Sequence, residues 1–173
     1  FAFLAGSAFV FVDAMGASER AFSLYLGLVS LGVFAGTAFA RRALPRLGLE
    51  RLIAAGTGVM LAAGATMAAL AWLGVREPLA VAAPMFVFMA AYMGTVPQAT
   101  AGALTPYPDI AGSAASLMSF IQFVIAASVA LVVGFAFDGT TRPMASAIVA
   151  AGTLSFVAFR LLVRRAAPTT PCR

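Results

Sequence analysis

Five long stretches of the chain contain no charged residue: 21–40, 52–73, 79–97, 110–137 and 143–159. Most approach the roughly 20 residues that an α-helix needs to cross a hydrocarbon layer about 30 Å thick. In water, such helices would have to be buried on every side, and a chain of 173 residues cannot form a core that large. The sequence therefore predicts an all-α fold, built as a polytopic bundle of transmembrane helices.

A further apolar stretch, residues 1–12, is too short to span, because twelve helical residues rise only about 18 Å. The chain begins with Phe, and no basic leader or small-residue cleavage site of a signal peptide is visible. We therefore expect a sixth helix whose start is missing and a chain that is the carboxyl-terminal part of something longer. Residues 1–163 then form one six-helix unit and 164–173 a tail, with spans at about 1–12, 21–40, 52–73, 79–97, 110–137 and 143–163.

Composition narrows the function classes. The chain is 62% hydrophobic with a net charge of +5, and its eleven basic residues, all Arg, lie mainly at short junctions rather than in a patch that nucleic acid would need. A membrane-embedded enzyme would need a metal or a nucleophile with a base. The chain has no His, and none of the spans contains an acidic side chain. We therefore expect no enzymatic activity, no metal, no cofactor and no nucleic-acid partner.

The positions of the arginines predict the orientation. Cytoplasmic junctions of membrane proteins are enriched in Arg and Lys. Three arginines, Arg20, Arg76 and Arg142, lie at one set of alternate junctions. The other set carries eight: Arg41, Arg42, Arg46, Arg51, Arg160, Arg164, Arg165 and Arg173. The loop at 41–51 and the carboxyl terminus should therefore be cytoplasmic.

Local signals predict where helices begin and end. Ser18 can cap the second helix, because a Ser side chain accepts a hydrogen bond from a free backbone N–H of the first turn. The two prolines within 105–109 interrupt the helix, and Asp109 can cap the next one. Pro143 suits the first turn of the last helix.

Small residues four apart predict close contacts between helices, because they let backbones approach each other. Gly32, Gly36 and Ala40 form such a strip on the second span. Shorter strips pair Gly58 with Ala62 and Gly64 with Ala68 on the third span, and Gly112 with Ser116 on the fifth.

The junction after the second span resembles a known loop. Its glycines and arginines are Gly36, Arg41, Arg42, Arg46, Gly48 and Arg51. They can reflect positive-inside topology alone. They also resemble the basic loop between helices 8 and 9 of the major facilitator superfamily. The strongest form of that loop has an acidic residue just before the basic pair, where this chain has Ala40, so the sequence does not support a charge relay at this point.

A second segment, residues 96–122, resembles helices 10 and 11 of the Bcr/CflA drug-efflux group. It shares the exit of helix 10 through Pro and small residues, and an Ala-Gly-Ser-Ala-Ala-Ser entrance to helix 11 that ends at Gln122. The segment Asp13-x-x-Gly16-x-Ser18 is similar to the loop between helices 7 and 8 of that group. The resemblance aligns the whole chain with helices 7 to 12.

The resemblance implies one half of a major facilitator fold: the carboxyl-terminal half of a proton-coupled antiporter that exports amphipathic drugs across the cell inner membrane. Its partners would be the lipid bilayer, the missing amino-terminal six-helix half, drugs and protons. In transporters of this family, the acidic and basic groups that couple transport to protons lie in the amino-terminal half. An ionisable side chain within the membrane is the usual candidate for such a group. This half should therefore be inactive alone. The alternative is a non-transporting membrane scaffold, or a half-unit that needs a separate partner chain.

Substrate contacts must then come from polar, aromatic and methionine side chains. In the resembled fold, helices 7, 8, 10 and 11 line the central cavity, while helices 9 and 12 face lipid. Gln122 can contact a ligand or hydrogen-bond a neighbouring helix, and these two roles are equally supported. Each of the others taken singly is better explained by packing, although as a set they suit amphipathic ligands. The candidate substrate-binding residues are Phe3, Phe9, Tyr25, Met89, Tyr92, Met93, Phe120 and Gln122.

Overall fold

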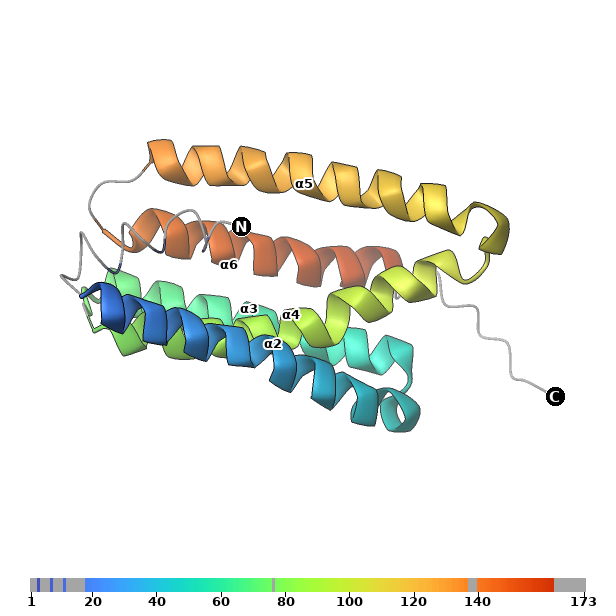
Figure 1. Cartoon of the computed structure of the whole chain (residues 1–173), viewed down its shortest axis with the longest axis horizontal. Coiled ribbons are helices and arrows are strands. Elements are labelled where there is room, and N and C mark those ends of the chain that lie inside the picture. Colours follow the sequence, from blue (N-terminus) through green and yellow to red (C-terminus); the bar gives the residue numbers. More distant parts are fainter. Residues whose placement is uncertain are drawn as a thin grey trace.

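The computed structural model describes residues 3, 7, 11, 18–75, 77–136 and 140–163. These residues form helices and connecting turns, and no strand occurs among them. The α-helices lie roughly alongside one another (Figure 1). In chain order they are α2 (Glu19–Leu47), α3 (Leu49–Trp72), α4 (Pro78–Leu104), α5 (Ala111–Phe135) and α6 (Arg142–Ala158). A short 3₁₀-helix, η2 (Pro108–Ile110), precedes α5, and a π-helical turn, η3 (Phe159–Val163), follows α6.

Among the described residues, five helices are long and apolar enough to cross a membrane. Large apolar side chains lie exposed on their outer faces, among them Phe34, Leu131 and Leu154. A water-soluble protein of this size would bury most such side chains, whereas lipid tails solvate them. The all-helical prediction is confirmed, and these helices have the properties of a multi-pass membrane protein. Of the expected first span, only Phe3, Ser7 and Phe11 are among the described residues.

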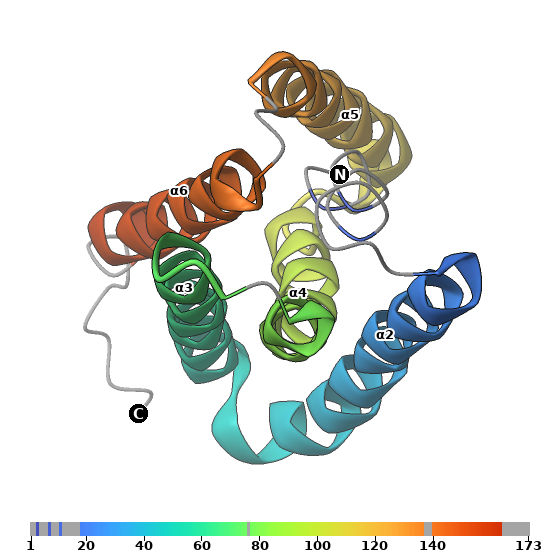
Figure 2. The same ribbon diagram turned by 90° about the vertical axis from the view of Figure 1, so that its left-hand side faces the viewer.

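The helices are unevenly packed (Figure 2). The helix α4 packs against α2 on one side and α3 on the other, and α3 also packs against α6. By contrast, α5 contacts α4 and α6 at few points, and Val133 is its one buried residue. The bundle therefore has a well-packed body of α2, α3, α4 and α6, with α5 standing apart along one side.

Glycines bring α2 and α4 together. A Cβ atom added to Gly32 would lie 2.5 Å from the carbonyl oxygen of Phe86, and one added to Gly36 would lie 2.8 Å from the Cα atom of Ala90. Ala40, one turn further on, is fully buried. The predicted strip on the second span is thus confirmed as a close helix contact, where a larger side chain would force the backbones apart.

A similar contact joins α3 and α6. A Cβ atom on Gly64 would lie 3.4 Å from the Cα atom of Val149, and one on Gly152 would lie 3.3 Å from the Cα atom of Leu61. The predictions for Gly58 and Gly112 were wrong, because a Cβ atom at either position would have no neighbour within 4 Å. Small residues at helical spacing permit a close contact but do not by themselves require one.

The predicted start signals are partly confirmed. The backbone N–H of Ala21 donates to the Ser18 hydroxyl over 3.3 Å, and Pro143 lies in the first turn of α6. Asp109 does not cap α5: it lies within η2, and the cap position is Ile110, which makes no side-chain cap hydrogen bond. The segment 105–109, with its two prolines, leads into a 3₁₀ turn. Asp109 is part of that turn and is therefore not at the position from which its side chain could cap α5.

Two helices continue beyond their predicted ends. The expected loop at 41–51 is helical except for Gly48, because α2 runs on to Leu47 and α3 begins at Leu49. A charged residue marks where a helix leaves the hydrocarbon layer. The helix itself need not end there, because the backbone can stay helical in the headgroup region. The chain reverses at Gly48, whose φ of 76° suits Gly. In the same way α4 continues through Pro97 to Leu104, as prolines are tolerated in membrane helices.

Candidate functional site

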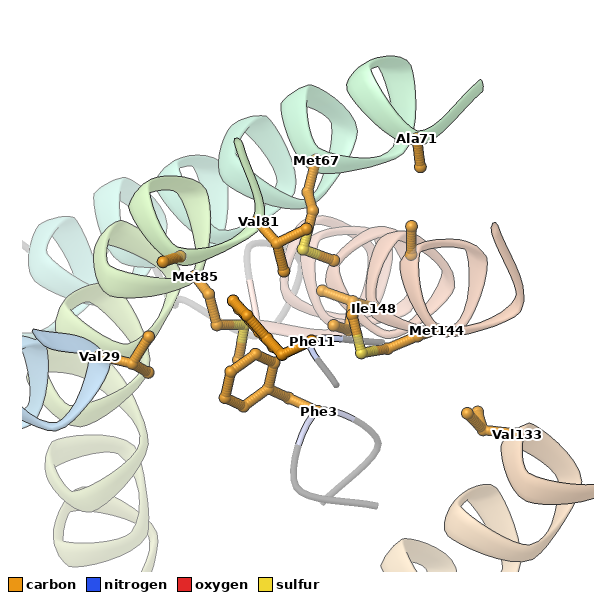
Figure 3. Close-up of a cluster of buried hydrophobic side chains, with 12 residues drawn as sticks. Phe3, Phe11, Val29, Met67, Ala71, Val81, Met85, Val133, Met144 and Ile148 are labelled. Carbon is orange, nitrogen blue, oxygen red and sulfur yellow. The ribbon is translucent and has the colours of Figure 1, made fainter. Parts of the chain in front are cut away.

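A cluster of aromatic and methionine side chains occupies the interior near the start of α2 and α4 (Figure 3). The rings of Phe3 and Phe11 meet edge to face with centroids 6.5 Å apart, and Phe11 stacks on Tyr25 at 5.6 Å. Met67 and Met144 enter the same cluster from α3 and α6 and are each 2% exposed. Phe3 belongs both to this cluster and to the wall of the cavity described next.

The cavity has a volume of about 440 Å³ and lies between α3, α4, α5 and α6, with Phe3 at one wall. Small-molecule sites commonly have volumes of about 300–1,000 Å³ and mostly apolar linings. Because α5 stands apart from the body of the bundle, space remains beneath it. The lining residues are Phe3, Met60, Met85, Phe88, Met89, Tyr92, Met93, Val96, Ala126, Val129, Ala147, Ile148, Ala151, Gly152 and Ser155.

Methionines line one side of this cavity. Met85, Met89 and Met93 are four residues apart on α4, so they share one helix face, and Met60 comes from α3. Met85 and Met60 are 2% and 3% exposed, whereas Met89 and Met93 are only half-buried. The thioether side chain is flexible and polarizable, so such a wall can adapt to ligands of different shapes.

Polar groups in the lining are few. Among the described lining residues, Tyr92 and Ser155 are the ones whose side chains can form hydrogen bonds, and there is no carboxylate or guanidinium. A charged ligand would lose its hydration without an opposite charge to replace it, which costs several kcal/mol or more. The lining therefore suits a neutral or weakly polar amphipathic molecule that uses one or two hydrogen bonds for orientation.

The predicted substrate-binding residues fall into three groups. Phe3, Met89, Tyr92 and Met93 line the cavity. Tyr25 lies in the neighbouring aromatic cluster, and Phe120 is 65% exposed on α5, outside the cavity lining. Phe9 lies outside the described residues.

Gln122 lies on the face of α5 that borders the cavity, since Ala126 and Val129 follow it at helical spacing. Its side chain is exposed, and no hydrogen bond joins its amide to another described residue. The interhelical hydrogen bond that was one of the two predicted roles of Gln122 is therefore not formed with any described residue.

Sequence reasoning missed the contributions of α3 and α6 to the cavity. Met60 and Ser155 come from helices that the resemblance assigns to the lipid-facing set. The four-residue spacing of Met85, Met89 and Met93 could have identified the α4 wall. Nothing in the sequence indicates that α6 supplies the opposite wall, because its Ala and Gly residues there are common in any membrane helix.

The predicted basic loop separates into two parts. Gly36 is buried at the contact with α4. Arg41, Arg42 and Arg46 lie exposed on the last turns of α2, and Arg51 lies in the first turns of α3 beyond Gly48. None of these arginines lines the methionine-rich cavity.

The fold and the cavity define a class: an all-helical protein that has, among the described residues, five membrane-competent helices, of which α3, α4, α5 and α6 line a lipophilic, methionine-rich cavity. Within the described part of the chain, no group of three or more His, Cys, Asp or Glu side chains could hold a metal ion. Comparison with known proteins gives no match to a family model, a curated protein or a solved structure.

Proposed function

We propose that this chain is the carboxyl-terminal half of a proton-coupled efflux antiporter of the major facilitator superfamily, of the Bcr/CflA type. It exports amphipathic small molecules across the inner membrane, with its carboxyl terminus in the cytoplasm. In this proposal the cavity between α3, α4, α5 and α6 holds part of the substrate, and the segment around residues 1–12 is the first of six spans.

The observation that carries the proposal is the chemistry of the cavity. It combines a volume of about 440 Å³ with four methionines, aromatic rings and two hydroxyl groups. Such a surface binds apolar and amphipathic molecules without strict geometric demands. An enzyme site would need a nucleophile, a base or a metal at the same place, and the described lining offers only the Tyr92 and Ser155 hydroxyls.

Proton coupling is assigned to the other half of the transporter. A coupling group must gain and lose a proton within the membrane, and intramembrane carboxylates or histidines usually serve this purpose. The charge-free spans of this chain contain neither. The two halves would therefore divide the task, with the proton site in one and a lipophilic part of the substrate path in the other.

A cavity-filling variant tests the proposal. The chain is joined to the six-helix first half of a Bcr/CflA-type transporter, and drug tolerance is measured in cells that lack other efflux pumps. Ala151→Phe, inside the cavity, should lower tolerance to some drugs more than others at unchanged protein level. Leu154→Phe, on the outer face of α6 where Leu154 is 71% exposed, is the matched control and should change nothing. Equal tolerance with Ala151→Phe, or no tolerance from the joined protein, would favour a scaffold.

A further inference from the structure

A second cavity, of about 350 Å³, lies where α3 begins and α6 ends. It shares no lining residue with the methionine-rich cavity. Residues from two helices that are distant in the sequence meet there, and several of them are charged or aromatic. The lining residues are Glu50, Arg51, Ala54, Phe156, Phe159 and Arg160.

The charges in this cavity are not balanced. Arg51 and Arg160 are exposed, and neither forms an ion pair within the described part of the chain. Glu50 is the one acidic residue of the lining, so two guanidinium groups face one carboxylate and leave a formal charge of +1. That charge matches a single phosphodiester group.

Aromatic rings give the cavity a fixed wall. The guanidinium carbon of Arg160 lies 5.1 Å from the centroid of the Phe156 ring, a cation–π contact that holds the arginine over the wall. Phe159 is only 6% exposed and packs into the bundle. A guanidinium held in this way can donate two parallel hydrogen bonds to phosphate oxygens with little loss of side-chain freedom.

Apolar side chains are also exposed on α6 and η3, the two elements that supply Phe156, Phe159 and Arg160 to the cavity. Leu154, Val157 and Leu161 follow one another at spacings of three and four residues, and they are 71%, 41% and 51% exposed. Free phosphate would use none of this surface. A phospholipid would use both parts, with its headgroup in the cavity and its acyl chains along these side chains.

We infer that this cavity binds the headgroup of an anionic phospholipid of the phosphatidylglycerol type. Arg51 and Arg160 donate to the phosphate oxygens, and the Glu50 carboxylate accepts from a headgroup hydroxyl. Basic cavities between transmembrane helices at the cytoplasmic side are sites of this kind. The inference requires only that the chain resides in a membrane. It is independent of transport, so binding and efflux can fail separately.

Lipid binding to the purified full chain tests the inference. The delipidated chain is titrated in detergent with phosphatidylglycerol, with phosphatidylcholine of the same acyl chains, and with inorganic phosphate, and bound lipid is counted by native mass spectrometry. We expect phosphatidylglycerol to bind at least about tenfold more tightly than phosphatidylcholine. Arg51→Gln with Arg160→Gln should remove this preference. Arg41→Gln with Arg42→Gln changes the charge equally on exposed positions of α2 outside the cavity and should retain it.

A third variant distinguishes specific lipid binding in the cavity from nonspecific attraction of the anionic headgroup to the arginines. Ala54→Leu fills the cavity but keeps both arginines, and it should also weaken phosphatidylglycerol binding by about tenfold through steric overlap. It serves as the decisive variant if the double substitution at Arg51 and Arg160 does not fold. Three results would overturn the inference: equal loss in the Arg41 and Arg42 control, equal binding of phosphatidylcholine, or displacement of the lipid by inorganic phosphate at similar concentration.

Discussion

The contact between α2 and α4 gives the sharpest prediction for stability. At Gly36, a Cβ atom would lie 2.7 Å from the carbonyl carbon and 2.8 Å from the Cα atom of Ala90, with the carbonyl oxygen nearer still. The neighbouring atoms are backbone, so no side-chain rotation can relieve the overlap. Gly36→Ala should therefore force α2 and α4 apart along the best-packed contact of the bundle.

The magnitude follows from two opposing terms. Overpacking in a close contact costs about 1–3 kcal/mol, and replacing Gly by Ala within a helix returns up to about 1 kcal/mol. We expect Gly36→Ala to lower the free energy of unfolding by about 1–2 kcal/mol. Gly58→Ala on α3 is the matched control, since a Cβ atom there has no neighbour within 4 Å. It should raise stability by about 0.5–1 kcal/mol.

Equilibrium unfolding of the purified chain in mixed micelles, titrated with a denaturing detergent and followed by circular dichroism, measures both variants. The opposite signs are the essential result, because a general sensitivity of the membrane helices to substitution would shift both midpoints in the same direction. Wild-type or greater stability for Gly36→Ala would refute the close contact between α2 and α4.

Three further predictions concern the ligand, the topology and one surface contact. If α5 moves inward to bind a ligand, Gln122→Ala in the joined transporter should change tolerance to some drugs only, at unchanged protein level; a uniform loss that follows expression would assign Gln122 to packing. In a cysteine-free background, Leu73→Cys should react with an impermeant reagent from outside the cell and Leu47→Cys should not, both positions being exposed at helix ends. Arg142→Gln should lower the free energy of unfolding by about 0.5–1 kcal/mol and alter Trp72 fluorescence, because the guanidinium lies 5.1 Å from that ring; an unchanged emission spectrum would contradict the contact.

Much of the helical architecture could be predicted, because hydrocarbon imposes strict demands on a backbone. Charge-free stretches located five helices, and Ser18 and Pro143 marked two starts. Helix ends were harder to predict. Arginines show where hydrocarbon stops, but the hydrogen bonds of α2 continue past Arg41 to Leu47, where the headgroup region tolerates both charge and helix.

The cavity was only partly predictable. Met89, Tyr92 and Met93 lie on one helix, and their spacing indicates a shared region of the helix surface. The position of α6 opposite them depends on the contacts of Gly64 with Val149 and of Gly152 with Leu61, which pair residues distant in the sequence. Helical periodicity describes one helix at a time, so it cannot tell which second helix completes a wall.

Proton-driven drug transport tests the central claim most directly. The chain, alone or joined to a Bcr/CflA-type first half, is reconstituted into liposomes, and movement of an amphipathic drug is measured after a pH gradient is imposed. The account predicts transport that follows the gradient for the joined protein, loss of that transport with Ala151→Phe, and no transport by the chain alone. Proton-linked transport by the chain alone would contradict it, as would a joined, folded protein that moves no drug.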